Sequence, residues 1–411
     1  MSMNKSITNS FNSFTTSIIF SILILGYGQG TQNNGWNQLT ETLVGCSGRV
    51  SAANKSLFVY SIPTNRNNVN FLNIKSWDGE TWRGVGHSLK KDVTQPQQIL
   101  GPSLISDHNG KPIVAWSETI SLSTTIDNPM NLWVKHWNGT SWEALGDNLR
   151  INGTKNALFP SLAADSQNNV FIAWQEGPWL RNQDSISNST IYLKRWDGTQ
   201  WLEVAPPIPG AYPNLAIDAD GMPVIAYVLE EDTFVKGKVA KWDGSSWEYL
   251  GNMLNEDETR SVDPHSLSIA FNGDGQPIVA SRQDVSYKNG KFVVQQWTGK
   301  TWQVLDGQFL VDSKNIAQDI SLYAKGDKIT VAFTEYEDPR TSPTAGRFPS
   351  PLLYVKIQES GAWQLLNEEP LGYDVVCSTI WIDEENRPVV AWQENNIITR
   401  TPKFVVSRFE Q

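Results

Sequence analysis

The side chains best suited to acid–base chemistry in this 411-residue sequence are its histidines and a few tyrosines. The four histidines are His87, His108, His136 and His265. None of them recurs at a fixed repeat position, and none has the spacing of metal ligands. His265 is the best placed, because it enters a predicted strand from the face that should carry the long loops. Paired with Tyr336 or Tyr373, it would have the acid–base groups of a polysaccharide lyase. The sequence predicts no metal site and no cofactor.

Paired carboxylates offer a different chemistry, that of glycoside hydrolysis. Glu337 and Asp338 are adjacent in the longest predicted loop. The Asp-containing turns superficially suggest sialidases, but they lack the Ser-x-Asp-x-Gly-x-Thr-Trp spacing of that family. Lyase and hydrolase chemistry therefore both remain open at this point.

One glutamate recurs at a fixed place, two residues after the aromatic end of a predicted strand: Glu118, Glu176, Glu335 and Glu394. A ring of such carboxylates at a channel mouth could bind cations or sugar hydroxyls. The alternative is structural, because a lysine stands near the end of the next strand in three of these units: Lys135, Lys194 and Lys356. Antiparallel pairing would make each lysine a cross-strand partner of its glutamate, and we favour this interpretation. Glu394 has no such lysine, since Ser407 takes that place.

Two tryptophans outside the regular pattern are candidates for stacking on a ligand. Trp179 lies in a long polar loop beside Arg181, and Trp133 leads into a strand. An aromatic ring in such a loop either stacks on a ligand, such as a sugar ring, or anchors the loop. Trp381 stands where related segments have alanine, and we expect it to narrow a central channel.

The elements that position these residues belong to a repeat. The phrase Trp-Asp-Gly-x-x-Trp, or a close variant, begins at Trp77, Trp137, Trp196, Trp242 and Trp297, with 46 to 60 residues between copies. A period of this size indicates a repeat array. Each unit contains four short apolar runs separated by turns, with no helical period.

Four-stranded units of this kind predict an all-β fold, a seven-bladed β-propeller. Second strands with a penultimate alanine recur six times, and a degenerate first copy at Leu57–Tyr60 brings the count of second strands to seven. The last unit lacks its fourth strand, and the segment at Trp36 matches that strand. We therefore expect the N-terminal strand to complete the last blade and close the ring, which leaves no open sheet edge.

The blade pattern also assigns the two faces of the ring. The tight turns of every blade should lie on one face, here called the turn face. The variable loops between second and third strands should lie on the other, here called the loop face. Because variable loops on a rigid scaffold usually carry function, a site is expected around the loop-face end of the channel.

The two cysteines, Cys46 and Cys377, each open a first strand, in the first and last blades. These blades are neighbours only if the ring closes. A disulfide there would hold the seam, and secretion permits it; two buried thiols are the alternative.

Composition and termini bear on location and partners. A net charge of −10 without a Lys/Arg stripe argues against nucleic acid. Residues 1–30 have the weakly basic start and short apolar run of a secretory signal peptide, with a retained anchor as the alternative. Residues 31–411 should then form one propeller domain, a secreted or cell-surface monomer without a membrane span.

The units resemble those of bacterial secreted repeat proteins whose blades read Pro-x-Val-Ala-Trp, then Trp-Asp-Gly-x-x-Trp-x-x-Leu-Gly. The match covers about residues 35–411 and is clearest from Trp137 to Gly146 and from Trp242 to Gly251. A weaker similarity, confined to Trp-Asp-Gly-x-x-Trp and Leu-Gly, is to seven-bladed propeller lectins that bind fucose-type sugars between blades. These resemblances imply a propeller fold and favour a sugar ligand.

The leading hypothesis is a secreted, non-catalytic protein that recognises a glycan or another extracellular ligand through its loop face. A carbohydrate-active enzyme, lyase or hydrolase, is the second hypothesis. A scaffold for protein partners is the third.

Overall fold

The computed structural model describes residues 35–39, 43–44, 50–53, 56–62, 71–89, 98–119, 129–178, 184–255, 259–283, 290–306, 309–338, 350–395 and 402–410. Every structural statement below concerns these residues. The expected signal segment, Cys46, Trp179 and Arg181 lie outside them. Residues 34–411 form one compact unit.

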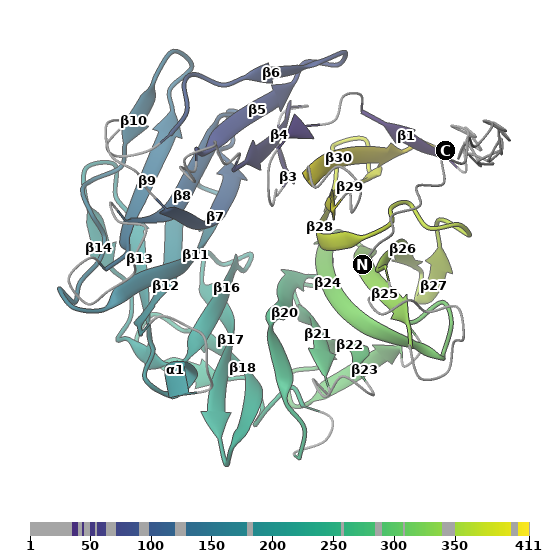
Figure 1. The fold of residues 1–411 in the computed structure, drawn as a ribbon. Helices are drawn as coiled ribbons and strands as arrows, with labels where there is room; N and C mark the ends of the chain where they lie inside the picture. Colours follow the sequence, from purple (N-terminus) through teal and green to yellow (C-terminus); the bar gives the residue numbers. More distant parts are fainter. Residues whose placement is uncertain are drawn as a thin grey trace, which may run out of the picture. The chain divides into compact units, whose positions relative to one another are not determined.

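The described chain folds into seven four-stranded antiparallel sheets, arranged as blades in a ring with each blade's first strand innermost (Figure 1). This confirms the predicted seven-bladed β-propeller. Blades 1 to 3 comprise β3 (Val50–Ala53), β4 (Ser56–Ser61), β5 (Asn73–Trp77) and β6 (Trp82–Gly84); β7 (Gln98–Ser106), β8 (Pro112–Thr119), β9 (Asn131–Trp137) and β10 (Trp142–Ala144); and β11 (Asn156–Ala164), β12 (Val170–Gly177), β13 (Thr190–Trp196) and β14 (Trp201–Glu203). The short strand β15 (Ile208–Pro209) also pairs with β13.

Blades 4 to 6 comprise β16 (Ala211–Ile217), β17 (Pro223–Glu231), β18 (Phe234–Trp242) and β19 (Trp247–Tyr249); β20 (Val262–Phe271), β21 (Pro277–Gln283), β22 (Lys291–Trp297) and β23 (Trp302–Asp306); and β24 (Asn315–Lys325), β25 (Lys328–Glu337), β26 (Leu352–Glu359) and β27 (Ala362–Leu365). Blade 7 comprises β28 (Val375–Ile382), β29 (Pro388–Asn395), β30 (Pro402–Phe409) and the N-terminal β1 (Trp36–Gln38), with β2 (Leu43–Val44) also paired to β30. The single described helix, α1 (Asp184–Ser187), is far too short to cross a bilayer.

The ring closes as the sequence predicts. β1 pairs with β30, with Trp36 opposite Phe409, and the Trp36 indole donates to the carbonyl of Leu366 at 3.3 Å. β28 of blade 7 also contacts β3 of blade 1. Cys377 lies in β28 beside this seam, but Cys46 is outside the described residues, so the disulfide stays a prediction.

The Trp-Asp-Gly-x-x-Trp phrase is a hairpin turn that also joins neighbouring blades. In blade 3, Asp197 Oδ1 accepts the backbone N–H groups of Thr199 and Gln200 at 2.8 Å, and these bonds hold the pKa of Asp197 down at about 2. Gly198 takes the turn at φ 102°, which favours glycine. The second tryptophan, Trp201, donates its indole N–H to Leu145 of blade 2 at 2.7 Å. The phrase is therefore structural, as expected.

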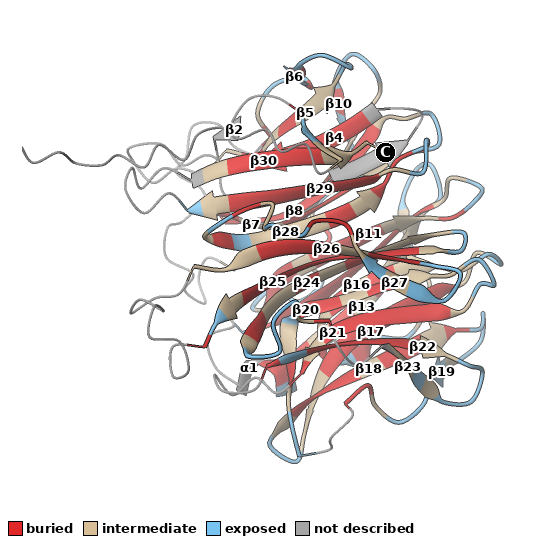
Figure 2. Cartoon of the chain, turned by 90° about the vertical axis from the view of Figure 1, so that its right-hand side faces the viewer, coloured by how far each residue is buried: buried red, intermediate tan, exposed pale blue. Residues whose placement is uncertain are grey.

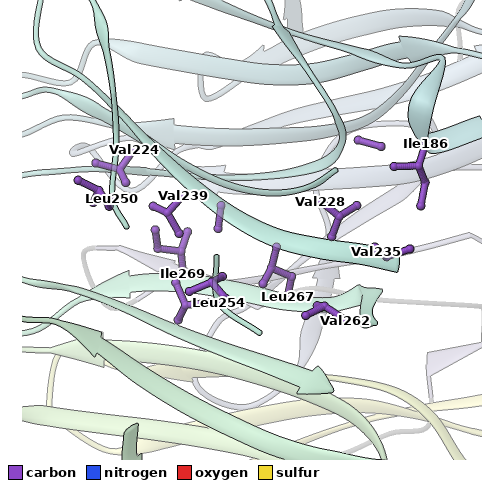
Figure 3. Packing of buried hydrophobic residues seen from close by; sticks show 13 residues of the cluster. Ile186, Val224, Val228, Val235, Val239, Leu250, Leu254, Val262, Leu267 and Ile269 are labelled. Atoms are coloured by element: carbon purple, nitrogen blue, oxygen red, sulfur yellow. The ribbon is translucent and has the colours of Figure 1, made fainter. Parts of the chain in front are cut away.

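The core lies between blades, not in the channel. Figure 3 shows one such layer, in which Val228 and Val239 of blade 4 pack against Leu267 and Ile269 of blade 5. The penultimate second-strand alanines are all 0% exposed: Ala115, Ala173, Ala226, Ala280, Ala332 and Ala391. Close packing at this position accounts for the recurring alanine in blades 2 to 7, whereas blade 1 has Tyr60 there.

Side-chain hydrogen bonds also tie successive first strands together around the channel. A polar residue on the first strand of each of blades 2 to 6 accepts a backbone N–H from the next blade: Ser103 from Leu162 (3.0 Å), Ser161 from Leu215 (2.9 Å), Asn214 from Ile269 (3.3 Å), Ser268 from Leu322 (3.3 Å) and Ser321 from Ile380 (3.3 Å). The channel wall from blade 2 to blade 7 is thus a bonded belt. The exposed tight turns gather at one face of the ring, on the right in Figure 2.

Candidate functional site

Three of the four recurring glutamates, Glu118, Glu176 and Glu335, are buried, and the fourth, Glu394, is partly exposed. Glu176 is 0% exposed and accepts hydrogen bonds from the backbone N–H groups of Ile151 (2.6 Å) and Asn152 (2.7 Å) and from the Trp174 indole (3.1 Å). In blade 6, Glu335 likewise accepts from Val311 at 2.9 Å. Each carboxylate therefore holds the chain segment that enters its blade from the preceding one.

The other two glutamates share part of this arrangement. Glu118 is 2% exposed and accepts from the Trp116 indole at 2.6 Å. Glu394 accepts from the Trp392 indole at 2.8 Å and lies 3.5 Å from Lys403 Nζ. The series does not form an open ring of carboxylates at the channel mouth.

The predicted glutamate–lysine pairs are wrong for blades 3 and 6. In blade 3 the register places Lys194 opposite Ile172 and Glu176 opposite Thr190. Because the strands are antiparallel, moving along β12 from Ile172 to Glu176 moves the partner away from Lys194. In blade 6, Lys356 lies opposite Val331 and over the Phe333 ring, 5.8 Å from its centroid. In blade 2, Lys135 lies opposite Val114.

The remaining candidates separate into core and channel positions. Trp133 lies opposite Trp116 and packs against the core between blades 1 and 2. Trp381 lines the channel and stacks on Tyr323, with 4.1 Å between ring centroids. Glu337 ends β25 and Asp338 is 5% exposed, so the expected pair of carboxylates does not lie in an open loop.

His265 lines a cavity of about 320 Å³ in the channel, but its aromatic neighbour is not one of the predicted tyrosines. Its ring packs edge-on against Tyr212, with 4.7 Å between centroids, and Phe159 lies 6.1 Å away. Tyr336 lies opposite Ile316 in blade 6, and Tyr373 is 52% exposed next to β28.

Irregularities in the first strands bring this group together near the loop-face end. Phe159 (φ 51°) and Tyr212 (φ 53°) have left-handed backbones, each just before a proline, where blade 2 has Gly101 (φ 51°). Such a conformation strains a bulky residue. The Gln175 side chain supports it by accepting the Tyr212 N–H at 2.5 Å. The two rings then lie 4.6 Å apart.

Blade 5 departs furthest from the repeat. Val262 pairs with Gln283 and Leu267 with Ser281, so four first-strand residues, 263–266, bulge opposite Arg282 alone. Asp263 organises this bulge: its carboxylate accepts the His265 N–H at 3.0 Å and pairs with Arg282 Nη1 at 2.7 Å. The Arg282 side chain is 11% exposed, so this ion pair is largely buried.

Asp319 of blade 6 continues the same layer. Its carboxylate accepts the Ser378 N–H of blade 7 at 3.1 Å and the Ser266 hydroxyl of blade 5 at 3.4 Å. We call Tyr212, Asp263, His265, Arg282 and Asp319 the channel-mouth cluster. It joins blades 4 to 6 and contacts blade 7.

Burial sets the protonation of this cluster. It raises the pKa of Asp319 to about 6, with a further rise from the Asp263 charge, while the hydrogen bond from Ser378 opposes the shift. Surrounding protein lowers the pKa of His265, although the ring is exposed to the cavity, and the Asp263 charge opposes this. Burial raises the pKa of Tyr212 to about 12. Burial therefore disfavours the charged forms of both His265 and Asp319.

Several buried polar atoms around the cluster have no hydrogen-bond partner in the described part of the chain: Gln175 Nε2, Arg282 Nε, Gln318 Oε1 and Ser378 Oγ. Such atoms are rare in native proteins and call for an explanation. Of these four residues, Ser378 is the one that lines the channel cavity.

Sequence reasoning found His265 but missed Tyr212, Asp263, Arg282 and Asp319. One signal was present, because Arg282 stands where the equivalent strands of other blades have Ser117, Gln175, Thr334 and Gln393. The bulge that carries Asp263 was not visible, since strand pairing alone defines it.

No protein-family model and no curated protein matches this sequence. Solved structures do match. A protein of unknown function from Dyadobacter fermentans is 13% identical, with a TM-score of 0.50, over 76% of this chain and 95% of that one. An ulvan lyase, described as a new family of polysaccharide lyase, is 10% identical, with a TM-score of 0.55, over 90% of this chain and 95% of that one.

A sialidase from Trypanosoma rangeli is 12% identical, with a TM-score of 0.50, over 91% of this chain and 58% of that one. At these identities the likeness is one of fold. The chain is a seven-bladed β-propeller, with a cluster of ionisable and aromatic side chains at one end of its channel.

Proposed function

We propose that this protein binds a carbohydrate chain at the loop-face end of its channel, through the channel-mouth cluster. The observation that carries the proposal is the break in the repeat. The blades largely reuse the same turn and packing residues, whereas here strained aromatics, a four-residue bulge and a buried ion pair lie together around His265, which lines the channel cavity. Strain and perturbed ionisation of this kind cluster at functional sites.

The chemistry of the cluster suits a sugar. His265 and Ser378 line the cavity and offer polar groups to it, and Tyr212 and Phe159 supply aromatic surface beside His265. A cavity of about 320 Å³ lies at the lower end of the range for small-molecule sites and suits one sugar unit of a longer chain. The fold likeness to an ulvan lyase makes ulvan and other acidic polysaccharides a natural first probe.

The test is a panel of neutral and acidic polysaccharides, ulvan included, applied to the wild-type protein, His265→Ala and Tyr249→Ala. Tyr249 is 56% exposed and follows the turn of blade 4, away from the cavity, so its variant is the matched control. The proposal expects at least one ligand whose binding falls about tenfold or more in His265→Ala only. An unchanged affinity in that variant, or no ligand on the panel, would count against the site.

A second candidate, a polysaccharide lyase or glycoside hydrolase, has its own support in the protonation of the cluster. His265, whose pKa is lowered by burial, packs against Tyr212 and lines the same cavity as Asp319, whose pKa is about 6. Incubation with the same panel, followed by assay for unsaturated or reducing-end products, separates the two. Product formation that His265→Gln abolishes and His108→Gln preserves would establish catalysis, and its absence with intact binding would leave recognition alone.

We also propose that the protein acts outside the cell, as a monomer. The support is the apparent signal segment in residues 1–30 and the net charge of −10. Protein partners on the loop face are the third possibility. This possibility would be favoured over the first two if no polysaccharide of the panel bound and if the wild-type protein captured an extracellular protein that His265→Ala did not.

A further inference from the structure

The turn face carries a feature that the channel site does not use, at the junction of blades 3 and 4. A pocket of about 350 Å³ opens there between the first turn of blade 3 and the first turn of blade 4. Its lining includes Asp165 and Asn169 from one turn, Asp220 from the other, and Arg195 from β13. Trp242, which is 8% exposed, contributes to the apolar part of the lining.

Arg195 occupies a position that has a defined role in the neighbouring blades. The residue before the third-strand tryptophan pairs with the first aspartate of its own blade's turn. In blade 2, His136 Nε2 lies 3.1 Å from Asp107 Oδ2, and in blade 4, Lys241 Nζ lies 2.7 Å from Asp218 Oδ2. The repeat therefore predicts an Arg195–Asp165 pair in blade 3.

That pair does not form. Instead, Asp165 accepts three hydrogen bonds from its own turn. Asn169 Nδ2 donates to Asp165 Oδ2 at 2.6 Å, and the backbone N–H groups of Gln167 and Asn169 donate to Oδ1 at 2.9 and 2.8 Å. Blade 4 has Met222 at the place of Asn169, which leaves Asp218 Oδ2 available to Lys241. Within the described part of the chain, the Arg195 side chain makes no hydrogen bond or ion pair, and only its backbone is paired, in β13.

An arginine in a pocket without a carboxylate partner is suited to an oxyanion, because its planar guanidinium can bind two oxygens of a carboxylate or sulfate. The Asp165 charge is already satisfied by three donors and is 8% exposed. Asp220 is exposed at the pocket wall. It is the group that would oppose an anion.

The molecule contains its own comparison site. A similar pocket of about 420 Å³ lies between blades 5 and 6 and includes Asn272 and Gln296. Gln296 takes the place of Arg195 and bonds to Gln276. This pocket has the same position in the repeat but no cation at that place.

We propose that the blade 3–blade 4 pocket is a second binding site, which uses Arg195 to bind the carboxylate or sulfate group of a ligand about the size of a monosaccharide. It lies on the turn face, whereas the channel-mouth cluster lies near the loop face. The inference rests on the broken Arg195–Asp165 pair and does not depend on the proposed function of the channel.

The test is calorimetric titration of the full chain with sodium sulfate, glucuronate and glucose. Sulfate or glucuronate should bind, and glucose should bind at least about tenfold more weakly. Binding of sulfate but not glucuronate would assign the site to sulfate groups, and binding of glucuronate but not sulfate would assign it to carboxylates. Equal affinity for glucose, or binding of none of the three, would overturn the proposal.

Three variants locate the binding. Arg195→Gln should lower the affinity for the anion about tenfold or more. Asn169→Met should also lower it while keeping the arginine, because it reproduces blade 4 and frees Asp165 to pair with Arg195. Asp220→Asn should raise it by removing a repelling charge. His136→Gln, at the same repeat position in blade 2, is the control and should change nothing.

A melting temperature measured for each variant separates loss of the site from loss of the fold. Anion affinity that survives both Arg195→Gln and Asn169→Met in folded protein would show that the anion binds elsewhere and would refute the assignment.

Discussion

At the scale of single residues, Asp319 connects the fold to the candidate site. Its carboxyl holds blades 5, 6 and 7 together through Ser266 and Ser378 and lies in the cavity wall near His265. Because burial raises its pKa from 3.8 to about 6, the folded protein binds a proton there more tightly than the unfolded chain does. The same group should therefore affect both stability and the ligand site near pH 6.

Asp319→Asn tests this coupling. The raised pKa means that Asp319 favours folding below about pH 4 and that this contribution is lost as the pH rises through about 6. Asn does not titrate, so the variant does not lose stability as the pH rises through this range. The unfolding free energy of the variant minus that of wild type should therefore increase from about pH 4 to above pH 6, by at most about 3 kcal/mol. Urea unfolding at a series of pH values measures the difference. A difference that is constant with pH would contradict the assigned protonation.

At the scale of elements, the second strands of blades 3 and 6 each end in a glutamate that holds the connection from the preceding blade. Glu176 binds the segment at Ile151 and Asn152, and Glu335 binds the segment at Val311. The recurrence of this glutamate was visible in the sequence, but its role was not. The strand register and the path of the connecting segment decide whether it meets a lysine or a backbone N–H.

Glu176→Gln should destabilise the protein by about 2 kcal/mol. Hydrogen bonds to a charged acceptor are among the stronger ones, and the glutamine NH2 would face one of the backbone N–H groups of Ile151 and Asn152 that the carboxylate accepts. Glu203→Gln, on the exposed fourth strand of the same blade, should have little effect. Denaturant unfolding measures both. Equal stabilities for the two variants would show that Glu176 does not hold the connection.

At the scale of the whole molecule, the ring was predictable and the site was not. Turn chemistry repeats in every blade, so local signals such as Asp197-Gly198 and the displaced Trp36 strand specified the fold and its closure. The channel-mouth cluster arises where one blade departs from the others. A departure such as the bulge at 263–266 is defined only by pairing with β21, so no local pattern marks it.

Ring closure makes its own prediction at Trp36. Trp36→Ala removes a half-buried ring that packs on Phe409 at 5.2 Å and should cost about 2–4 kcal/mol. It should also expose the edge of β30 and promote association between molecules. Trp201→Ala, at the same position in blade 3, should destabilise the fold without this association, as light scattering after size-exclusion chromatography would show. Equal association of both variants would argue against the seam as the cause.

The central claim is that function resides in the channel-mouth cluster, and a crystal structure with the best-binding oligosaccharide of the panel tests it most directly. The account predicts sugar density in the channel cavity, in contact with Tyr212 and His265 near the loop face. Density confined to the turn face or the outer edge of the blades, with the cavity empty of sugar, would contradict it.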